Sequence, residues 1–237
     1  VAFMPTSCLE NETCHAQRPV HLIEYFSADW CEPCVEVGEA LNGIASNQTV
    51  VLQHHPSPQD ITFFSDSKQR NDDDYRLLFL PSIVLDGTHL LTGTRQAMDL
   101  VSTMENNSNQ WHGLADVRLT NNTLHWNAST DGTVVVWAVA PTPHEASGKI
   151  HPSVAHTRLS ANASSGEMAV NATGFPANTS LIILLEQEGV RSLTVASLAP
   201  TGSMELNDNT PGETTDSLGE SEAYLPVLVG LFLALML

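Results

Sequence analysis

Basic residues are scarce in this chain of 237 residues. Nine Lys and Arg stand against 27 Asp and Glu, which gives a formal net charge of −18 at pH 7. Only two of the nine are lysines, Lys68 and Lys149. So few cations oppose binding to nucleic acid or to an anionic membrane surface, because both present phosphates. We therefore exclude nucleic acid as a partner.

Several sequence signatures of other protein classes are also absent. The chain has no internal repeat typical of a solenoid, no Gly-rich phosphate loop and no Ser-His-Asp signature of a hydrolase. An apolar fraction of 42% nevertheless supplies enough side chains for a packed core. The sequence therefore predicts a folded globular protein outside these classes.

Two features favour export from the cytoplasm. The four cysteines form two close pairs, Cys8 with Cys14 and Cys31 with Cys34, as is typical of an oxidising compartment. Asn-x-Ser/Thr acceptors for glycosylation are frequent, which favours a surface exposed outside the cell. They lie at Asn11, Asn47, Asn106, Asn121, Asn127, Asn162, Asn171 and Asn178. We expect an extracytoplasmic or cell-surface glycoprotein.

Residues 20–112 have the alternating pattern of an α/β domain, after an N-terminal segment at 1–19. Apolar positions at helical spacing follow a first strand, and the pattern repeats with turn residues at the boundaries. The expected elements are strands at 21–27, 49–54, 82–85 and 89–92, and helices that follow Cys31, Asp72 and Thr94. This order predicts a βαβαββα domain.

Beyond residue 113 the apolar period changes to two. Short runs are separated by turn signals, which predicts a β-sandwich at 113–200. The expected strands are 117–119, 124–128, 133–140, 154–159, 167–172, 181–186 and 192–198. Trp111, Trp126 and Trp137 are expected in a core or at a domain interface.

The C-terminal region divides into an acidic linker at 201–222 and an apolar segment at 223–237. Every residue from Leu225 to Leu237 is apolar, but a helix of that length reaches only about 20 Å, against a hydrocarbon core of roughly 30 Å. We expect a short membrane anchor. The alternative is a buried terminal helix.

The Cys31-Glu32-Pro33-Cys34 sequence carries the chemistry. A cysteine at the N-terminus of a helix is favoured as a thiolate, and a second cysteine one turn later can close a disulfide with it. We predict that Cys31 attacks and Cys34 resolves. Half of a zinc site is the alternative, but it needs two further ligands, for which His54 and His55 are the nominal candidates.

The sequence resembles the thioredoxin superfamily through Phe26-Ser27-Ala28-Asp29-Trp30-Cys31-Glu32-Pro33-Cys34 and Leu80-Pro81-Ser82-Ile83-Val84-Leu85-Asp86-Gly87. The resemblance implies an α/β thioredoxin fold followed by an all-β, Ig-like sandwich, as in exported relatives. It also implies that Pro81 precedes its strand in the cis form beside the redox disulfide, where Pro81 and Trp30 contribute to substrate binding. Cys-Glu-Pro-Cys is similar to the motif of reductases of extracytoplasmic thiols.

One departure from the family concerns a buried carboxylate that relays protons. Tyr25 stands six residues before Cys31, where the family often has this carboxylate, and Glu24 is its neighbour. Adjacent strand residues point to opposite faces, so Glu24 can act as the relay only if a bulge shifts the strand. The alternative role for Glu24 is a structural salt bridge. Glu32 should raise the pKa of Cys31, which favours a reducing couple.

The other candidate sites are weaker. Cys8 and Cys14 are expected to form a structural disulfide, with a second redox pair as the alternative. His144, His151 and His156 are expected at the surface or in turns, because no carboxylate shares a recognisable spacing with them. No metal and no cofactor are therefore predicted.

These observations predict a thiol–disulfide oxidoreductase that acts on extracytoplasmic proteins, with an unidentified redox partner and attachment to a membrane at its C-terminus. The alternative is a noncatalytic surface protein for binding or adhesion, in which Cys31 and Cys34 form a structural disulfide. The reduction potential separates the two: roughly −270 to −120 mV is expected for a working couple and below about −300 mV for a structural bond.

Overall fold

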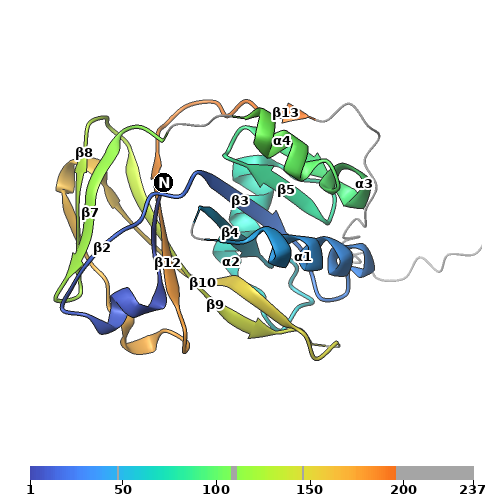
Figure 1. Cartoon of the computed structure of the whole chain (residues 1–237), viewed down its shortest axis with the longest axis horizontal. Helices are drawn as coiled ribbons and strands as arrows, with labels where there is room; N and C mark the ends of the chain where they lie inside the picture. Colours follow the sequence, from blue (N-terminus) through green and yellow to red (C-terminus); the bar gives the residue numbers. More distant parts are fainter. Residues whose placement is uncertain (47, 108–110, 146, 196–237) are drawn as a thin grey trace, which may run out of the picture. The chain divides into compact units, whose positions relative to one another are not determined.

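Strands make up most of the regular structure in the computed structural model, which describes residues 1–46, 48–107, 111–145 and 147–195 (Figure 1). The larger sheet is mixed, with parallel pairing of β10 with β4, β3 with β4, and β6 with β13. Its strands in spatial order are β1 (Ala2–Met4), β12 (Ser180–Glu186), β9 (Thr133–Pro143), β10 (Ile150–Asn162), β4 (Thr49–His54), β3 (His21–Phe26), β5 (Ser82–Leu85), β6 (His89–Thr92) and β13 (Thr194–Val195).

The smaller sheet is antiparallel. Its strands in spatial order are β11 (Glu167–Ala169), β8 (Thr123–Ala128), β7 (Leu114–Thr120) and β2 (Thr13–His15). Asn121 and Asn122 join β7 to β8 with positive φ of 47° and 62°, which asparagine tolerates in a tight hairpin turn. The helical elements are α1 (Glu32–Ile44), α2 (Ser65–Gln69), α3 (Gly93–Ala97), α4 (Leu100–Asn106), the π-helical η2 (Arg70–Tyr75), and the 3-10 turns η1 (Thr6–Glu10), η3 (Ala163–Ser165) and η4 (Ala172–Gly174).

The nine-stranded sheet overturns the predicted fold. Strands occur at 21–26, 49–54, 82–85 and 89–92 as expected, but they do not close a separate α/β domain. β10 pairs with β4 through Val154 and Gln53, which adds β9, β12 and β1 to the same sheet. The described chain is predominantly β, with few and mostly short helices. The prediction of an α/β thioredoxin fold followed by an all-β, Ig-like sandwich is therefore wrong.

Strand β9 shows why the pattern after residue 113 was misleading. A period of two implies one solvated face, yet Val134–Ala140 are all at most 3% exposed. Alternate side chains of β9 enter two different cores, one shared with the small sheet and one shared with β3 and β4. A strand covered on both faces belongs in the interior of a sheet. Trp126 and Trp137 are core residues, as predicted.

Two further elements differ from expectation. The second helical region begins at Ser65, not at Asp72, and runs through α2 and η2 to Tyr75. The described part of the last predicted strand, at 192–198, forms β13 (Thr194–Val195), which pairs with β6 of the larger sheet. The described residues 1–195 belong to one compact unit.

The two disulfides lie in different cores. Cys8 and Cys14 are joined, with Cα atoms 5.2 Å apart, and connect η1 to β2. Cys8 is buried in the core shared by the small sheet, whereas Cys31 and Cys34 lie in the core that contains the buried side of α1. This separation favours a structural role for the first pair over electron transfer to the second.

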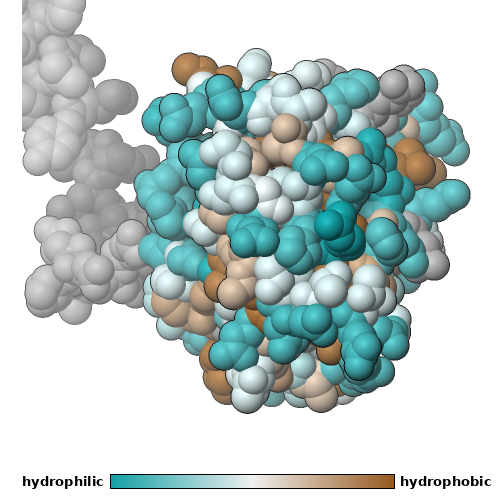
Figure 2. All heavy atoms as spheres, turned by 90° about the vertical axis from the view of Figure 1, so that its left-hand side faces the viewer, coloured by the Kyte–Doolittle hydropathy of each residue, from teal (hydrophilic) through white to brown (hydrophobic). Residues whose placement is uncertain are grey.

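The predicted glycosylation acceptors of the described chain are on the surface. Asn47 lies outside the described residues, and the asparagines of the other seven acceptors are all exposed. Figure 2 shows that the face carrying β7 and β8 is mostly hydrophilic. Exposure of the asparagine satisfies the first steric requirement for glycan attachment.

The C-terminal predictions fall outside the described residues, which end at 195. Both the predicted acidic linker at 201–222 and the predicted apolar anchor at 223–237 lie outside them. No helix within the described ranges has the length and apolar character needed to cross a bilayer.

A buried guanidinium connects three segments of the fold. Arg70 donates to the Glu24 carboxylate on β3 at 2.8 and 3.0 Å, to Asp74 at 3.0 Å and to Glu186 on β12 at 2.7 Å. The Tyr75 hydroxyl also donates to Glu24. Burial is the largest single effect and by itself would raise the pKa of Glu24. The charge and hydrogen bonds of Arg70, together with the neighbouring His54, outweigh it and hold the pKa far below its ordinary value.

Arg70→Met tests this connection, because it leaves the Glu24 carboxylate buried without its counter-charge. We expect the free energy of unfolding near pH 7 to fall by about 3–5 kcal/mol, measured by urea denaturation. Arg118→Met, at an exposed position on β7, is the matched control and should change stability by no more than about 0.5 kcal/mol.

The loss of unfolding free energy in Arg70→Met should be smaller at acid pH. In the wild type, the pKa of Glu24 is lower in the folded than in the unfolded protein. The ionised carboxylate therefore stabilises the fold at pH values above the unfolded-state pKa, and this stabilisation is lost as the pH falls through the folded-state pKa. In the variant, Glu24 accepts a proton readily, which relieves the cost of burying its charge. The difference between wild type and variant should therefore be smaller near pH 4 than near pH 7. Equal differences would show that Arg70 does not stabilise the Glu24 charge.

Candidate functional site

The Cys31–Cys34 disulfide closes the first turn of α1. Cys31 is the N-cap, Glu32 places a negative charge beside the positive end of the helix, and Pro33 stands in the first turn, where its missing N–H breaks no helical hydrogen bond. The Cα atoms of the two cysteines are 5.3 Å apart. The structure thus forms the predicted pair at the predicted helix N-terminus.

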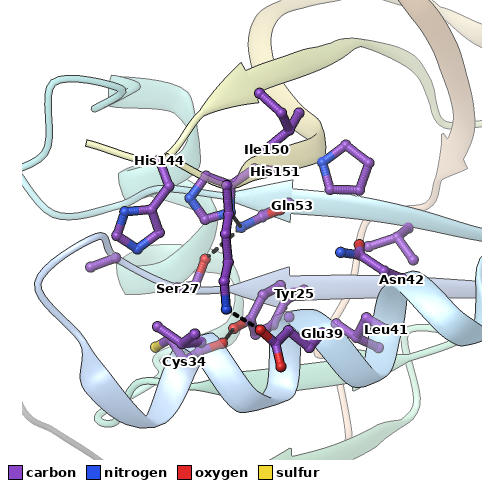
Figure 3. A pocket seen from close by; sticks show the side chains of 16 residues that line it. Tyr25, Ser27, Cys34, Glu39, Leu41, Asn42, Gln53, His144, Ile150 and His151 are labelled. Carbon is purple, nitrogen blue, oxygen red and sulfur yellow. Dashed lines mark hydrogen bonds and ion pairs between the residues drawn. The ribbon is translucent and has the colours of Figure 1, made fainter. Parts of the chain in front are cut away.

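Both half-cystines are buried. Cys31 is 0% exposed and Cys34 is 5% exposed. It is Cys34 that lines the neighbouring cavity, with its sulfur visible in Figure 3. Cys31 is the residue predicted to attack, so its reaction requires a local opening of the structure that buries it.

Glu24 and Tyr25 lie on opposite faces of β3. The Tyr25 hydroxyl donates to the Cys34 carbonyl oxygen at 2.6 Å, on the side of α1. Glu24 instead binds Arg70. Residues 23–26 pair in continuous register with both β4 and β5, so no bulge turns Glu24 toward the cysteines. Glu24 therefore forms the structural salt bridge that was the alternative for this residue, and the bulge that a relay role requires is not formed.

The two predicted substrate-binding residues differ in exposure. Trp30 is 37% exposed, and its indole N–H donates to the Ser57 hydroxyl at 2.9 Å. Pro81 follows a cis peptide bond, is buried, and accepts a hydrogen bond from the Gly93 N–H at 2.8 Å. Trp30 can offer surface to a substrate, whereas Pro81 offers little in this state.

A small cavity of about 50 Å³ lies beside the disulfide (Figure 3). Cys34 and Glu39 of α1 line one side, and His144 and His151 line the opposite side. Lys149 forms an ion pair with Glu39 across it. The cavity therefore brings Cys34 and two histidines of the C-terminal half into one site.

Asp29 joins the two histidines in a cluster of potential ligands. The same Asp29 oxygen, Oδ1, lies 2.8 Å from His151 Nε2 and 3.9 Å from His144 Nε2. One ligand atom from each of the three residues lies within 4.8 Å of the others. The two imidazole rings stack, with centroids 5.1 Å apart and an interplanar angle of 21°. Two imidazole nitrogens and one carboxylate oxygen suit a zinc or copper ion.

The electrostatics of this cluster follow from its hydrogen bonds. Burial would raise the pKa of Asp29, but the Glu145 N–H at 2.9 Å and the His151 ring hold it below its ordinary value. The Asp29 backbone N–H donates to Asp60 Oδ1 at 3.0 Å, which fixes the loop. Burial, and then the neighbouring His151, lower the pKa of His55 to about 3. An ionised carboxylate thus lies close to a buried, neutral imidazole.

The cluster of Asp29, His144 and His151 was not predicted from the sequence, from which His144, His151 and His156 were expected at the surface or in turns. In the structure, however, His144 is only 8% exposed and His151 contacts the carboxylate of Asp29, 122 residues away. No local spacing reveals the cluster, because it depends on the pairing of β10 with β4. His156 is not part of it and contacts Thr179 at 3.2 Å.

The zinc site considered for Cys31 and Cys34 is not formed. The two sulfurs are bonded to each other. His54 is buried 3.5 Å from Glu24, and His55 lies next to His151. His54, the last residue of β4, and His55 therefore have different neighbours, and neither is a ligand of the two sulfurs.

Comparisons with known proteins add little. No protein-family model matches the chain, and no curated protein sequence matches it. Among solved structures, the X-ray crystal structure of an Agrobacterium tumefaciens protein is 16% identical over 72% of this chain and 80% of its own length, with a TM-score of 0.46. Likeness at this level carries no argument about function, which must come from the site itself.

Glu24→Gln tests the corrected role of that residue. Loss of the charge that binds Arg70 should lower the free energy of unfolding by about 2 kcal/mol. The pH midpoint for alkylation of the reduced cysteines should stay unchanged, because Glu24 faces away from them. Stability is measured by urea denaturation, and alkylation by mass spectrometry between pH values at which the variant remains folded. A shift of the midpoint by about one pH unit would restore the relay hypothesis.

Proposed function

We propose that this protein is a thiol–disulfide oxidoreductase for extracytoplasmic protein substrates, with Cys31 and Cys34 as its redox pair. The observation that carries the proposal is a disulfide with a sequence separation of 3 at the N-terminus of a 13-residue helix. Backbone N–H groups and the helix dipole at this end favour a thiolate once the bond is reduced. No cofactor is needed for this chemistry.

Exchange proceeds through a mixed disulfide. The Cys31 thiolate attacks one sulfur of a substrate disulfide and releases the other as a thiolate, which takes up a proton. Cys34 then loses its proton and attacks Cys31, which releases the second substrate sulfur and forms the Cys31–Cys34 bond. The substrate gains two electrons and two protons, and the enzyme is left oxidised. A separate dithiol reductant must then supply two electrons and two protons to reduce the Cys31–Cys34 bond.

Acidic residues near the pair favour this reducing direction. Glu32 and Glu36 lie on α1 within the first two turns after Cys31, and both are exposed. Their negative charges oppose the helix dipole and disfavour the Cys31 thiolate, although solvent screens them. A less stable thiolate corresponds to a more reducing couple.

An exported location fits the same proposal. The two disulfides account for all four cysteines, and such bonds persist in oxidising compartments. The seven described glycosylation acceptors are exposed, which agrees with a surface that meets the secretory environment. Protein thiols and disulfides of that compartment are the proposed partners.

Burial favours a second candidate function. A half-cystine with 0% exposure, such as Cys31, behaves as expected for a structural disulfide in a noncatalytic binding or adhesion module. A reduction potential between roughly −270 and −120 mV supports the oxidoreductase, and one below about −300 mV supports the binding module.

Cys34→Ala provides the test in cells. Without Cys34, the mixed disulfide between Cys31 and a substrate has no internal route of resolution, so substrate proteins should accumulate as covalent adducts. Nonreducing electrophoresis should show these adducts, and a reductant should release them. Cys8→Ala and Cys14→Ala are included in every variant to prevent adducts at those positions.

The matched control is the variant that lacks both Cys31 and Cys34, which should show no adducts. Circular dichroism checks that the background variant remains folded. Absence of adducts in the Cys34→Ala variant, with Cys31 shown to be free and open to alkylation, would favour the binding module.

A further inference from the structure

We propose that Asp29, His144 and His151 form a binding site for a divalent transition metal ion of the zinc and copper class. The site is independent of the redox chemistry proposed above, since none of its ligands is a cysteine. It uses one carboxylate and two imidazoles, and both imidazoles line the cavity beside α1 (Figure 3).

The geometry is close to that of a bound ion. Ligand atoms at about 2.0–2.1 Å from zinc in a tetrahedral arrangement stand about 3.4 Å from one another. Asp29 Oδ1 lies 2.8 Å from His151 Nε2 and 3.9 Å from His144 Nε2, on either side of that value. Because all three ligand atoms lie within 4.8 Å of one another, shifts of about 1 Å suffice to receive an ion.

The Asp29 carboxylate is held in position for this role. Its side chain is 3% exposed, and Oδ2 accepts the Glu145 N–H at 2.9 Å, while the backbone N–H of Asp29 is anchored on Asp60. These contacts leave Oδ1 directed at the two histidines. A carboxylate fixed through its second oxygen resembles the supporting shell of known metal sites.

Gln53 provides the second support. Its amide nitrogen lies 3.0 Å from His151 Nδ1, 3.1 Å from His55 Nε2 and 2.9 Å from Ser27 Oγ. An amide nitrogen has two protons and cannot donate to all three atoms at once. Rotation of the amide would place its oxygen there to accept a proton from His151 Nδ1, which leaves Nε2 unprotonated for a metal.

Ligation by His144 changes a hydrogen bond at the other nitrogen of its ring. His144 Nδ1 accepts the Ser147 N–H at 3.3 Å, a long hydrogen bond. Binding of a cation at Nε2 transfers the ring proton to Nδ1 and breaks that bond. Ligation by His144 is therefore expected to reorganise the connection between β9 and β10.

The ligand types select the ion. Calcium and magnesium prefer sites built from oxygen atoms, whereas imidazole suits zinc and copper. Three protein ligands leave a fourth position for water or another small ligand, which the cavity of about 50 Å³ can hold. A net charge of −18 also raises the local concentration of cations.

Isothermal titration of the full chain with Zn²⁺ tests the proposal. The protein is freed of metal with a chelator and kept oxidised, so that both disulfides remove the thiols from competition. We expect one high-affinity Zn²⁺ per chain and no binding of Mg²⁺ under the same conditions. His151→Ala should weaken Zn²⁺ binding at least 30-fold, whereas the control His156→Ala should leave it unchanged.

A spectroscopic measurement identifies the ligands. The electron paramagnetic resonance spectrum of the Cu²⁺-loaded protein should show coupling to two imidazole nitrogens, and to one in His144→Gln. If His151→Ala does not fold, the Zn²⁺ affinity of His144→Gln provides the test instead, and it should be lower than that of the wild type. Failure to bind Zn²⁺, or equal binding by wild type and the folded variants, would overturn the site and leave the cluster as a hydrogen-bonded connection. Neither result bears on the adduct test for Cys31.

Discussion

Arg70 is the point on which the arrangement of this protein depends. Its guanidinium reaches Glu24 on β3, Asp74 on its own helical segment and Glu186 on β12, so it spans the central and outer parts of the nine-stranded sheet. A buried carboxylate on β3 has a large desolvation cost unless its partner is held in place. The helical segment from Ser65 to Tyr75 supplies that partner, because Arg70 lies within it.

The candidate site depends on a second junction, between β10 and β4. That junction brings the connection after β9 against the turn that precedes α1, and Asp29 contacts both Glu145 and His151 there. Cys34 and the two histidines consequently line one cavity although they are more than 100 residues apart in the chain.

Local features were predictable and long-range ones were not. The turn–helix position of Cys31, Cys34 and Pro33 follows from capping and helix chemistry, which act over a few residues. The hairpin at Asp86 and Gly87 was also predictable, because an Asp-Gly pair favours a tight turn. Both residues adopt the positive φ that such turns require. Sheet membership could not be found in this way, because an apolar run such as that of β9 does not show which strands will lie beside it. The Asp29 cluster depends on that missing information.

Lys149 allows chemical labelling at the cavity. It is one of only two lysines in the chain, and its side chain is 53% exposed where it pairs with Glu39. The other, Lys68, is 37% exposed and pairs with Asp72 on a different element. Reagents that acylate side-chain amines therefore have two targets, and one of them stands at the rim of the candidate site. A fluorophore or crosslinker attached at Lys149 would report directly on what enters the space between α1 and the histidines.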